Sequence, residues 1–257
     1  MNNLWQTIWV EALKARRSRM PLFTALAFAM LPLGGGFFMV ILKDPEFARQ
    51  VGLISAKAQL TMGTADWPTY LGFLAQGVAV GGIFLFGMVS IWAFGREYSD
   101  RTIKDLLALP TARPAIVLAK FVIVAAWSLV LTAEVCLIGW MVGIALRLPP
   151  VPVQLIQQGV VTTAVAAGLT MLLVTPIAFF ACAGHGYLPP VGIMILLVVL
   201  AQVSVFIGRG EFFPWAIPAL FAQGEPLGLA GIALVILTSI AGVMSTVGWW
   251  ERADQTH

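Results

Sequence analysis

Hydrophobic and polar positions are grouped along this chain in long blocks. Six blocks are almost entirely apolar, and each approaches or exceeds the roughly 20 residues that a helix needs to cross a bilayer about 30 Å thick. We therefore predict an all-α integral membrane protein with six transmembrane helices. The expected spans are residues 21–42, 70–94, 121–146, 159–183, 191–207 and 227–249.

Three further segments complete this plan. Residues 1–20 have an apolar side rich in tryptophan and a basic end, which predicts an amphipathic helix lying at the membrane interface. Residues 21–257 would then form one six-span domain. Residues 208–226 contain aromatic residues and two prolines, and they are expected to form two short half-buried helices at the membrane interface before the last span. Apolar residues at helical spacing in 43–69 predict a short surface helix there.

The composition supports a membrane protein. Hydrophobic residues make up 60% of the chain and charged residues 11%, whereas a soluble domain carries about 25% charged residues. The mean hydropathy is +0.92. With six spans both termini lie on one side, and that side would carry ten of the 15 lysines and arginines. This excess places both termini in the cytoplasm of a multi-pass cell-membrane protein.

The long polar segment from Phe94 to Lys120 separates the second and third spans. Opposite charges lie four residues apart in it, as in Glu97 and Arg101, and this spacing supports a solvated helix that Pro110 would end. The segment is either a docking element for a partner protein or an interfacial helix without a partner, and the spacing fits both equally. The candidate contact residues are Glu97, Asp100, Arg101, Lys104, Leu106 and Leu107.

Residues suited to catalysis are scarce. The sequence has two histidines, His185 in a glycine turn and His257 in the polar tail. Neither has a second metal ligand or catalytic partner close by in the sequence. No Gly-x-x-x-x-Gly-Lys-Ser/Thr loop occurs, so we do not expect this chain to bind ATP in that way. We expect neither an enzyme nor a metal or cofactor site in this chain.

Three polar side chains fall inside the expected spans. Glu134 is the only ionisable residue deep in a span, where a carboxylate costs about 2.5–3.5 kcal/mol on insertion scales. It is either a substrate or cation contact in a central path, or a carboxyl group hydrogen-bonded to a neighbour such as Thr132 or Gln76. Gln76 and Gln202 are the other two, and such groups more often bond helix to helix than bind ligands.

The second expected span is rich in glycine. Gly77 and Gly81 lie four residues apart, which is the spacing of a small-xxx-small packing face. Such a face predicts a close approach to another helix, either in the same subunit or in a second one.

These residues together resemble a known family, the permease subunits of type-2 ABC exporters, particularly the bacitracin-resistance and lantibiotic-immunity kind. The resemblance rests on a basic amphipathic N-terminal helix and on a motif of moderate specificity. Outside the motif the match rests on hydropathy and on the six-span layout. The motif residues are Phe94, Glu97, Arg101, Thr102, Leu106, Leu107, Pro110, Arg113 and Lys120.

The resemblance implies a dimer of permeases, of two copies or two related chains, working with two separate ABC ATPase subunits that bind ATP and Mg²⁺. Residues 1–20 would be the connecting helix, 97–109 the coupling helix in a groove of the ATPase, and 208–226 the extracellular re-entrant helices. The turn 184–190 is short and uncharged, so a second ATPase contact is not expected there. The substrate would be an amphipathic peptide antibiotic or a lipid-like molecule. Membrane lipids are further expected partners of the chain, and nucleic acid is not.

Two alternatives from other classes remain open. An integral membrane enzyme acting on lipid would use Glu134 or His185 as a general acid or base, but it needs more convergent polar groups than the sequence offers. The second alternative is a membrane assembly factor or an ion-coupled transporter. Ion coupling would favour more intramembrane carboxylates than Glu134 alone, and an inverted repeat.

Overall fold

The computed structural model describes residues 2–44, 64–103, 106, 108 and 111–252. The described part of the chain is helical and contains no strand, and six of its helical segments are long and apolar enough to cross a membrane. The predicted fold class is confirmed. The spans are α2 (Met20–Lys43), α4 (Trp67–Ser99), α6 (Arg113–Ala145), α7 (Val153–Leu173) continued by α8 (Thr175–Ala183), α9 (Leu188–Phe206) and α11 (Leu229–Arg252).

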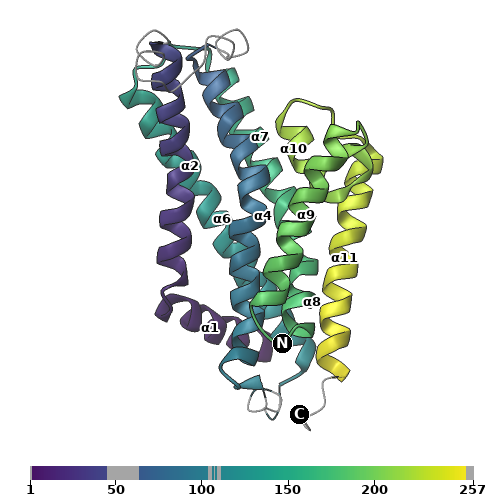
Figure 1. Cartoon of the computed structure of the whole chain (residues 1–257). Coiled ribbons are helices and arrows are strands. Elements are labelled where there is room, and N and C mark those ends of the chain that lie inside the picture. The colour runs from purple at the N-terminus through teal and green to yellow at the C-terminus, as the bar shows by residue number, and fades with distance from the viewer. Residues whose placement is uncertain (1, 45–63, 104–105, 107, 109–110, 253–257) are drawn as a thin grey trace.

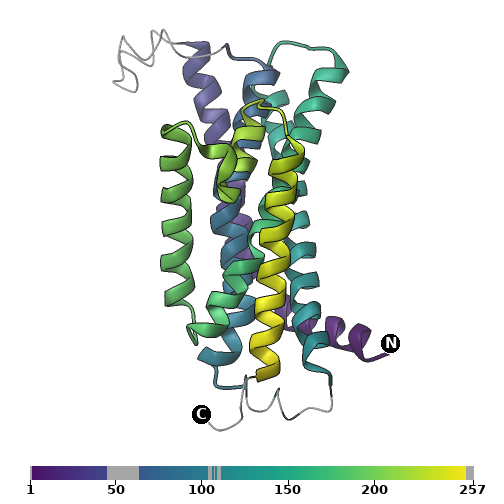
Figure 2. The same cartoon turned by 90° about the vertical axis from the view of Figure 1, so that its right-hand side faces the viewer.

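The shorter elements lie at the two ends of this bundle (Figure 1). The N-terminal helix α1 (Asn2–Arg17) runs across the lower end, at a steep angle to the spans. At the opposite end, the short helices η2 (Gly210–Phe212), η3 (Pro214–Ala216) and α10 (Ile217–Ala222) fold back beside α9 and α11, and α10 packs against α7 and α4 (Figure 2). Short helices are thus found where the sequence predicted them. The surface helix expected in 43–69 lies mostly outside the described residues.

Two spans continue beyond the hydrophobic blocks at the α1 end of the bundle. Helix α4 ends at Ser99, five residues after the expected boundary, and α6 begins at Arg113, eight residues before it. Both extensions are buried on one side, since Glu97 and Lys120 are each almost fully enclosed by neighbouring helices. Hydropathy ended these spans early because it registers the loss of apolar residues and not the continuation of the helix.

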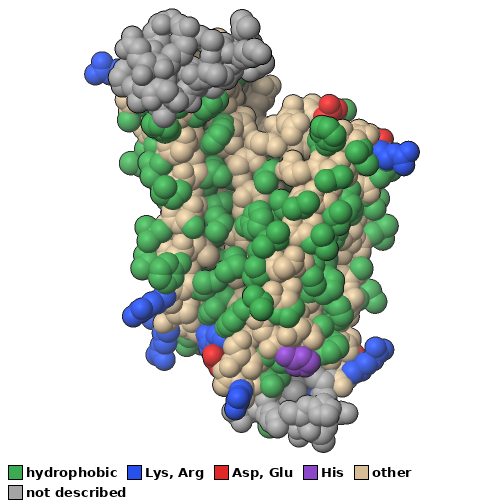
Figure 3. Space-filling view, in the orientation of Figure 1, with side chains coloured by type: hydrophobic (Ala, Val, Ile, Leu, Met, Phe, Trp, Pro, Cys, Tyr) green, Lys and Arg blue, Asp and Glu red, His purple; other side chains and the backbone are tan. Residues whose placement is uncertain are grey.

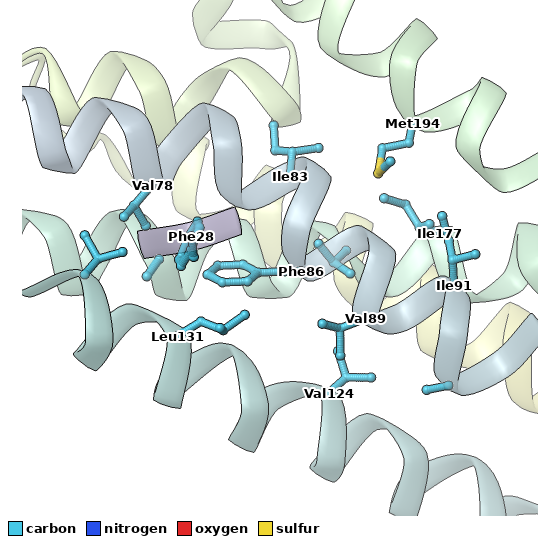
Figure 4. Close-up of a cluster of buried hydrophobic side chains, with 14 of the residues drawn as sticks. Phe28, Val78, Ile83, Phe86, Val89, Ile91, Val124, Leu131, Ile177 and Met194 are labelled. Carbon is cyan, nitrogen blue, oxygen red and sulfur yellow. The ribbon is translucent and has the colours of Figure 1, made fainter. Parts of the chain in front are cut away.

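Helix α4 is the central element of the core (Figure 4). Phe86 projects from it and meets Phe28 of α2 edge to face, with ring centroids 5.4 Å apart. Further along, α4 packs against Leu131 of α6 and Met194 of α9, all of them buried. Because α4 contacts α2, α6, α7, α8 and α9, a movement of α4 would displace helices of four other spans.

Proline and glycine mark the places where helices are broken or approach closely. The fourth span is interrupted at Val174, and α8 restarts with Pro176 in its first turn, as expected for a proline that cannot continue the hydrogen-bond ladder. A methyl group added at Gly242 of α11 would meet the backbone at Pro176, so α11 crosses directly at this break. The glycines at 35 and 36 likewise admit aromatic and valine side chains of α4 and α6.

Candidate functional site

The α1 end of α4 closes in a Schellman motif. Arg101 is in the left-handed region with φ 58°, the N–H of Thr102 donates to the carbonyl of Glu97 (3.0 Å), and the N–H of Arg101 donates to Tyr98 (3.2 Å). The expected helical pair of Glu97 with Arg101 is therefore not formed, because the helix stops between the two residues. Asp100 instead pairs with Arg96, with nitrogen and oxygen 3.5 Å apart.

The Glu97 side chain turns inward and belongs to a group of four charged side chains from three helices, here called the ion cluster: Glu11 and Lys14 of α1, Glu97 of α4 and Lys120 of α6. The Lys120 Nζ lies 3.0 Å from Glu97 Oε1 and 3.1 Å from Glu11 Oε2. The Lys14 Nζ lies 2.9 Å from the same Glu97 oxygen and 2.8 Å from Glu11 Oε1. Two positive and two negative charges thus close a neutral ring between the helices.

The ion cluster is buried and its hydrogen bonds are well satisfied. Lys120 is only 1% exposed and Glu97 3%. The ammonium of Lys120 has a third acceptor in the carbonyl of Ala93 (2.8 Å), which matches its three N–H donors. The second oxygen of Glu97 accepts from the hydroxyl of Thr102 (2.6 Å). Burial alone would lower the pKa of Lys14, but Glu11 and Glu97 raise it above its ordinary value.

A second cluster lies on the other side of the same helix end and consists of Tyr98, Phe179, His185 and Trp249, here called the aromatic cluster. The indole N–H of Trp249 donates to the hydroxyl of Tyr98 (3.1 Å). The His185 ring packs edge to face with Tyr98 at 5.3 Å and lies 6.0 Å from Trp249. His185 therefore serves here as a packing residue in the turn between α8 and α9.

The turn between α8 and α9 is seated directly on α4. A methyl group added at Gly95 would lie 3.1 Å from the carbonyl oxygen of Gly186, so a larger residue would push the turn away from α4 by a few tenths of an ångström. Consecutive residues of α4 thus face different neighbours: Glu97 holds α1 and α6, and Tyr98 holds α11 and the α8–α9 turn. The end of α4 is thus fastened to both the first and the second half of the chain.

The residues predicted to contact a partner are distributed unevenly around this point. Asp100 and Arg101 are exposed, Leu106 is partly buried against the core, and Glu97 is enclosed. Lys104 and Leu107 lie outside the described residues. Contact of this segment with a partner stays a prediction, and the structure divides the segment into an enclosed anchor at Glu97 and an exposed turn at Asp100 and Arg101.

The sequence analysis missed Glu11, Lys14 and Lys120 as partners of Glu97. The sequence analysis placed Lys120 at the end of the polar segment, and in the structure its side chain is buried inside the protein. A signal was present: Lys120 is followed directly by an apolar run, and Glu11 and Lys14 lie three residues apart, on one face of a helix. The contact between α1 and the two spans itself is not encoded locally.

Two of the predicted mid-span polar residues come together. Gln76 of α4 and Gln202 of α9 line a cavity of about 20 Å³ that Gln223, just after α10, also lines. The side-chain oxygen of Gln76 is buried and has no hydrogen-bond partner among the described residues. A cavity of this size admits one water molecule. The amides therefore form a small polar spot where the re-entrant helices meet the spans.

Glu134 lies elsewhere, on α6. The suggested partner Thr132 donates its hydroxyl to the carbonyl of Ser128 (2.8 Å), and no bond joins Glu134 to Gln76. Among the described residues, no side chain pairs with the Glu134 carboxyl group. It is partly exposed beside Val130 and Leu137, which are 51% and 59% exposed, so it borders an open apolar face of α6.

The predicted glycine face is used within the chain. A methyl group added at Gly77 would overlap the side chain of Leu31 in α2, while Gly81 leaves the same side chain at 3.8 Å. The close approach at Gly77 is made inside the subunit, and packing of this pair against a second subunit stays a prediction.

Comparison with known proteins identifies the family. The model of the ABC-2 family transporter proteins matches residues 7–201, which is more than half of the chain. The chain belongs to this family. The matched region of this ABC-2 transporter protein contains all four residues of the ion cluster.

A curated relative agrees with this assignment. The bacitracin transport permease protein BCRB of Bacillus licheniformis is 24% identical over 181 residues, which cover 67% of this chain and 85% of that protein. The resemblance inferred from the motif is thereby confirmed: this is an ABC-2 type permease, a multi-pass membrane protein of a transporter family.

Proposed function

We propose that this chain is the permease subunit of an ATP-driven exporter and that the exposed turn after α4 docks onto a separate ATPase subunit. The family and the permease relative support the transport role. The observation that carries the docking site is the fastening of α4 at Glu97 and Tyr98, directly before the exposed Asp100 and Arg101. A displacement of this turn would be transmitted directly through Glu97 and Tyr98 to both halves of the chain.

The ion cluster couples the movement of this turn to α1 and α6. Glu97 acts as a positioning residue, because its carboxylate is held by Lys14 of α1 and Lys120 of α6 and not by solvent. ATP binding in the partner would displace the turn, and α1, α4 and α6 would move as one unit. The aromatic cluster would transmit the same displacement to α11 and to the α8–α9 turn. Access to the transport path would then switch between the two sides of the membrane.

The proposed orientation places the α1 end in the cytoplasm. Among the residues that the structure describes, nine lysines and arginines lie at that end and three at the opposite end. Blue side chains accordingly gather along the lower rim in Figure 3. The positive-inside rule favours this orientation, with the re-entrant helices outside the cell. The ATPase would then meet the turn in the compartment that contains ATP.

The substrate class that fits is an amphipathic peptide antibiotic or a lipid-like molecule. The relative transports bacitracin by its name. Glu134, Gln76 and Gln202 are polar residues in apolar spans. The side-chain oxygen of Gln76 has no hydrogen-bond partner among the described residues, while Glu134 is partly exposed and Gln202 is exposed. We place them along the transport path, which would lie between this permease and a second copy or a related permease.

Copurification tests the docking proposal. The tagged chain is extracted gently from its native membrane, the proteins that come with it are identified, and the amount of any soluble ATPase bound per permease is measured. Arg101→Glu is expected to lose most of the ATPase, because it reverses the charge of the exposed turn. Arg101→Gly is the matched control for the backbone, since glycine adopts the left-handed conformation readily.

The two variants distinguish the charge of the turn from its backbone shape. If Arg101→Glu loses the ATPase and Arg101→Gly loses only part of it, the turn contacts the partner through its charge. Equal retention of the ATPase by both variants and by wild type would refute docking at this turn. A permease that purifies alone even after crosslinking would count against the ATP-driven exporter and favour the enzyme or assembly-factor alternatives.

A further inference from the structure

A lateral cavity at the α1 end of α11 lies beside the aromatic cluster, with which it shares Phe179 and Trp249, and apart from the ion cluster and the mid-span polar groups. It has a volume of about 600 Å³ and runs between α8 and the last turns of α11. Its lining residues are Phe179, Met244, Ser245, Gly248, Trp249 and Arg252.

The shape of this cavity is that of a trough with an apolar wall and a charged end. A methyl group added at Gly248 would meet no atom within 4 Å, so the floor is open. Met244 is 68% exposed on a spanning helix, and the trough therefore opens to the side of the bundle. From Met244 to Arg252 the helix rises about 12 Å, the length of a good part of an acyl chain. Trp249 lies near the charged end, as tryptophan does at membrane interfaces.

The charges at the end of the trough favour an anionic ligand. Arg252 is exposed in the last turn of α11. Arg113 adds a second guanidinium at the same helix end, where its Nη1 donates to the carbonyls of Trp250 (3.0 Å) and Glu251 (2.9 Å). Glu251 is the one acidic residue among the described neighbours in this turn. Guanidinium groups bind phosphate oxygens through paired hydrogen bonds.

We propose that this trough binds an anionic phospholipid, with one acyl chain along Met244 and Gly248 and its phosphate on Arg252. An acyl chain alone would use only the apolar wall, and a free phosphate would use only the arginine. A phospholipid uses both parts. Trp249 contacts this ligand on one side and donates its N–H to Tyr98 on the other, so the lipid touches the aromatic cluster that holds the end of α4.

Native mass spectrometry of the detergent-purified chain, supplied with equal amounts of phosphatidylglycerol and phosphatidylcholine, tests this site. Wild type is expected to retain phosphatidylglycerol preferentially. Arg252→Gln should reduce that retention about tenfold, which corresponds to the loss of about 1.4 kcal/mol. Arg209→Gln is the matched control, because Arg209 is an exposed arginine at the opposite end of the bundle, and it should retain as much lipid as wild type.

Two further arms distinguish this site from attraction by charge alone and from lipid bound elsewhere on the protein. Gly248→Leu or, should that variant not fold, Ser245→Leu fills the trough and should reduce retention while Arg252 is still present. Glycerol 1-phosphate in excess should not displace the lipid, since it lacks the chain. Equal losses in Arg252→Gln and Arg209→Gln would show general electrostatic attraction, and full retention with a filled trough would show binding elsewhere. Either result overturns the proposal.

Discussion

Polar groups at the α1 end of this molecule and polar groups in the middle of the membrane are treated in opposite ways. At the α1 end, four charged side chains from three helices form a closed, buried and neutral cluster, and each N–H of Lys120 has its acceptor. In the middle of the spans, Gln76 carries a buried oxygen that has no partner among the described residues. Glu134 likewise has no side-chain partner in the described part of the chain.

This difference separates polar groups that stabilise the fold from polar groups that would contact a transported substrate. An unpaired polar group inside a membrane has a free-energy cost that a structural role does not require. A buried ion cluster is different, because its members compensate one another and tie helices that hydrophobic contacts alone would leave free to slide. We therefore expect variants at the α1 end to act on stability and assembly, and variants at mid-span to act on transport.

The largest effect is expected from opening the ion cluster. Lys120→Met leaves Glu11 and Glu97 facing each other with Lys14 as their only cation in the cluster, and loss of one member of a buried pair costs about 3–5 kcal/mol. The variant should melt far below wild type in detergent, which size-exclusion chromatography after heating measures. Wild-type stability in Lys120→Met would show that the cluster does not hold α1 and α6 on α4.

The double variant Lys120→Met with Glu97→Gln sharpens this test. It removes one positive and one negative charge, so Lys14 and Glu11 remain as a compensated pair. Its stability should exceed the value expected from adding the two single effects by at least about 1 kcal/mol, as coupled neighbours do in a double-mutant cycle. Strict additivity would mean that the two side chains do not interact.

A smaller effect of opposite sign is expected at mid-span. Gln76→Leu removes a buried oxygen that has no hydrogen-bond partner in the described structure, and such a group carries a desolvation penalty of about 1–3 kcal/mol that one water in the cavity offsets in part. The variant should therefore be as stable as wild type or more stable by about 1 kcal/mol, while transport falls. A clear loss of stability would show that the amide is structural, and the contrast with the α1 end would fail there.

Glu134→Gln should change stability least of the span variants. The carboxyl group borders an exposed face and the substitution breaks no bond within the described chain. The free energy of unfolding, followed through the melting temperature, should therefore change by less than about 0.5 kcal/mol. Transport of a cationic amphipath in reconstituted vesicles should nevertheless fall about tenfold, or about 1.4 kcal/mol. Glu134→Asp is the matched control that keeps the charge. Unchanged transport in Glu134→Gln would remove this residue from the path.

The sequence was sufficient for the spans because hydropathy depends only on residues that are adjacent along the chain. It also singled out the segment around Glu97, since opposite charges and the bordering proline are local signals. It was not sufficient for the direction in which Glu97 points. The αL turn at Arg101 ends the helix, and a left-handed non-glycine residue leaves no clear trace in composition.

The partners of Glu97 show the same limit. Lys14 and Lys120 lie 83 and 23 residues away from it, and their meeting depends on how α1 crosses the ends of α4 and α6. The grouping of Gln76 and Gln202 with Gln223 depends likewise on where the re-entrant helices fold back. The sequence named Glu97 and the mid-span residues Gln76, Gln202 and Glu134 as candidates. Only the arrangement of helices shows which of them are paired within the chain.

The mildest way to loosen the α1 end is to titrate Lys14. Burial lowers the pKa of its ammonium group, but Glu11 and Glu97 raise that pKa above its ordinary value. Because the folded pKa is higher than the unfolded value of about 10.4, the stability that Lys14 adds is complete below that pH and is lost as the pH rises through the folded pKa. The difference in melting temperature between wild type and Lys14→Met should therefore be constant from about pH 7 to 9 and shrink above about pH 10.5. Comparing the two proteins cancels the titration of tyrosines and other lysines. A difference that is already lost near about pH 8 would mean that Lys14 gains nothing from the two carboxylates, and the cluster would then rest on Lys120 alone.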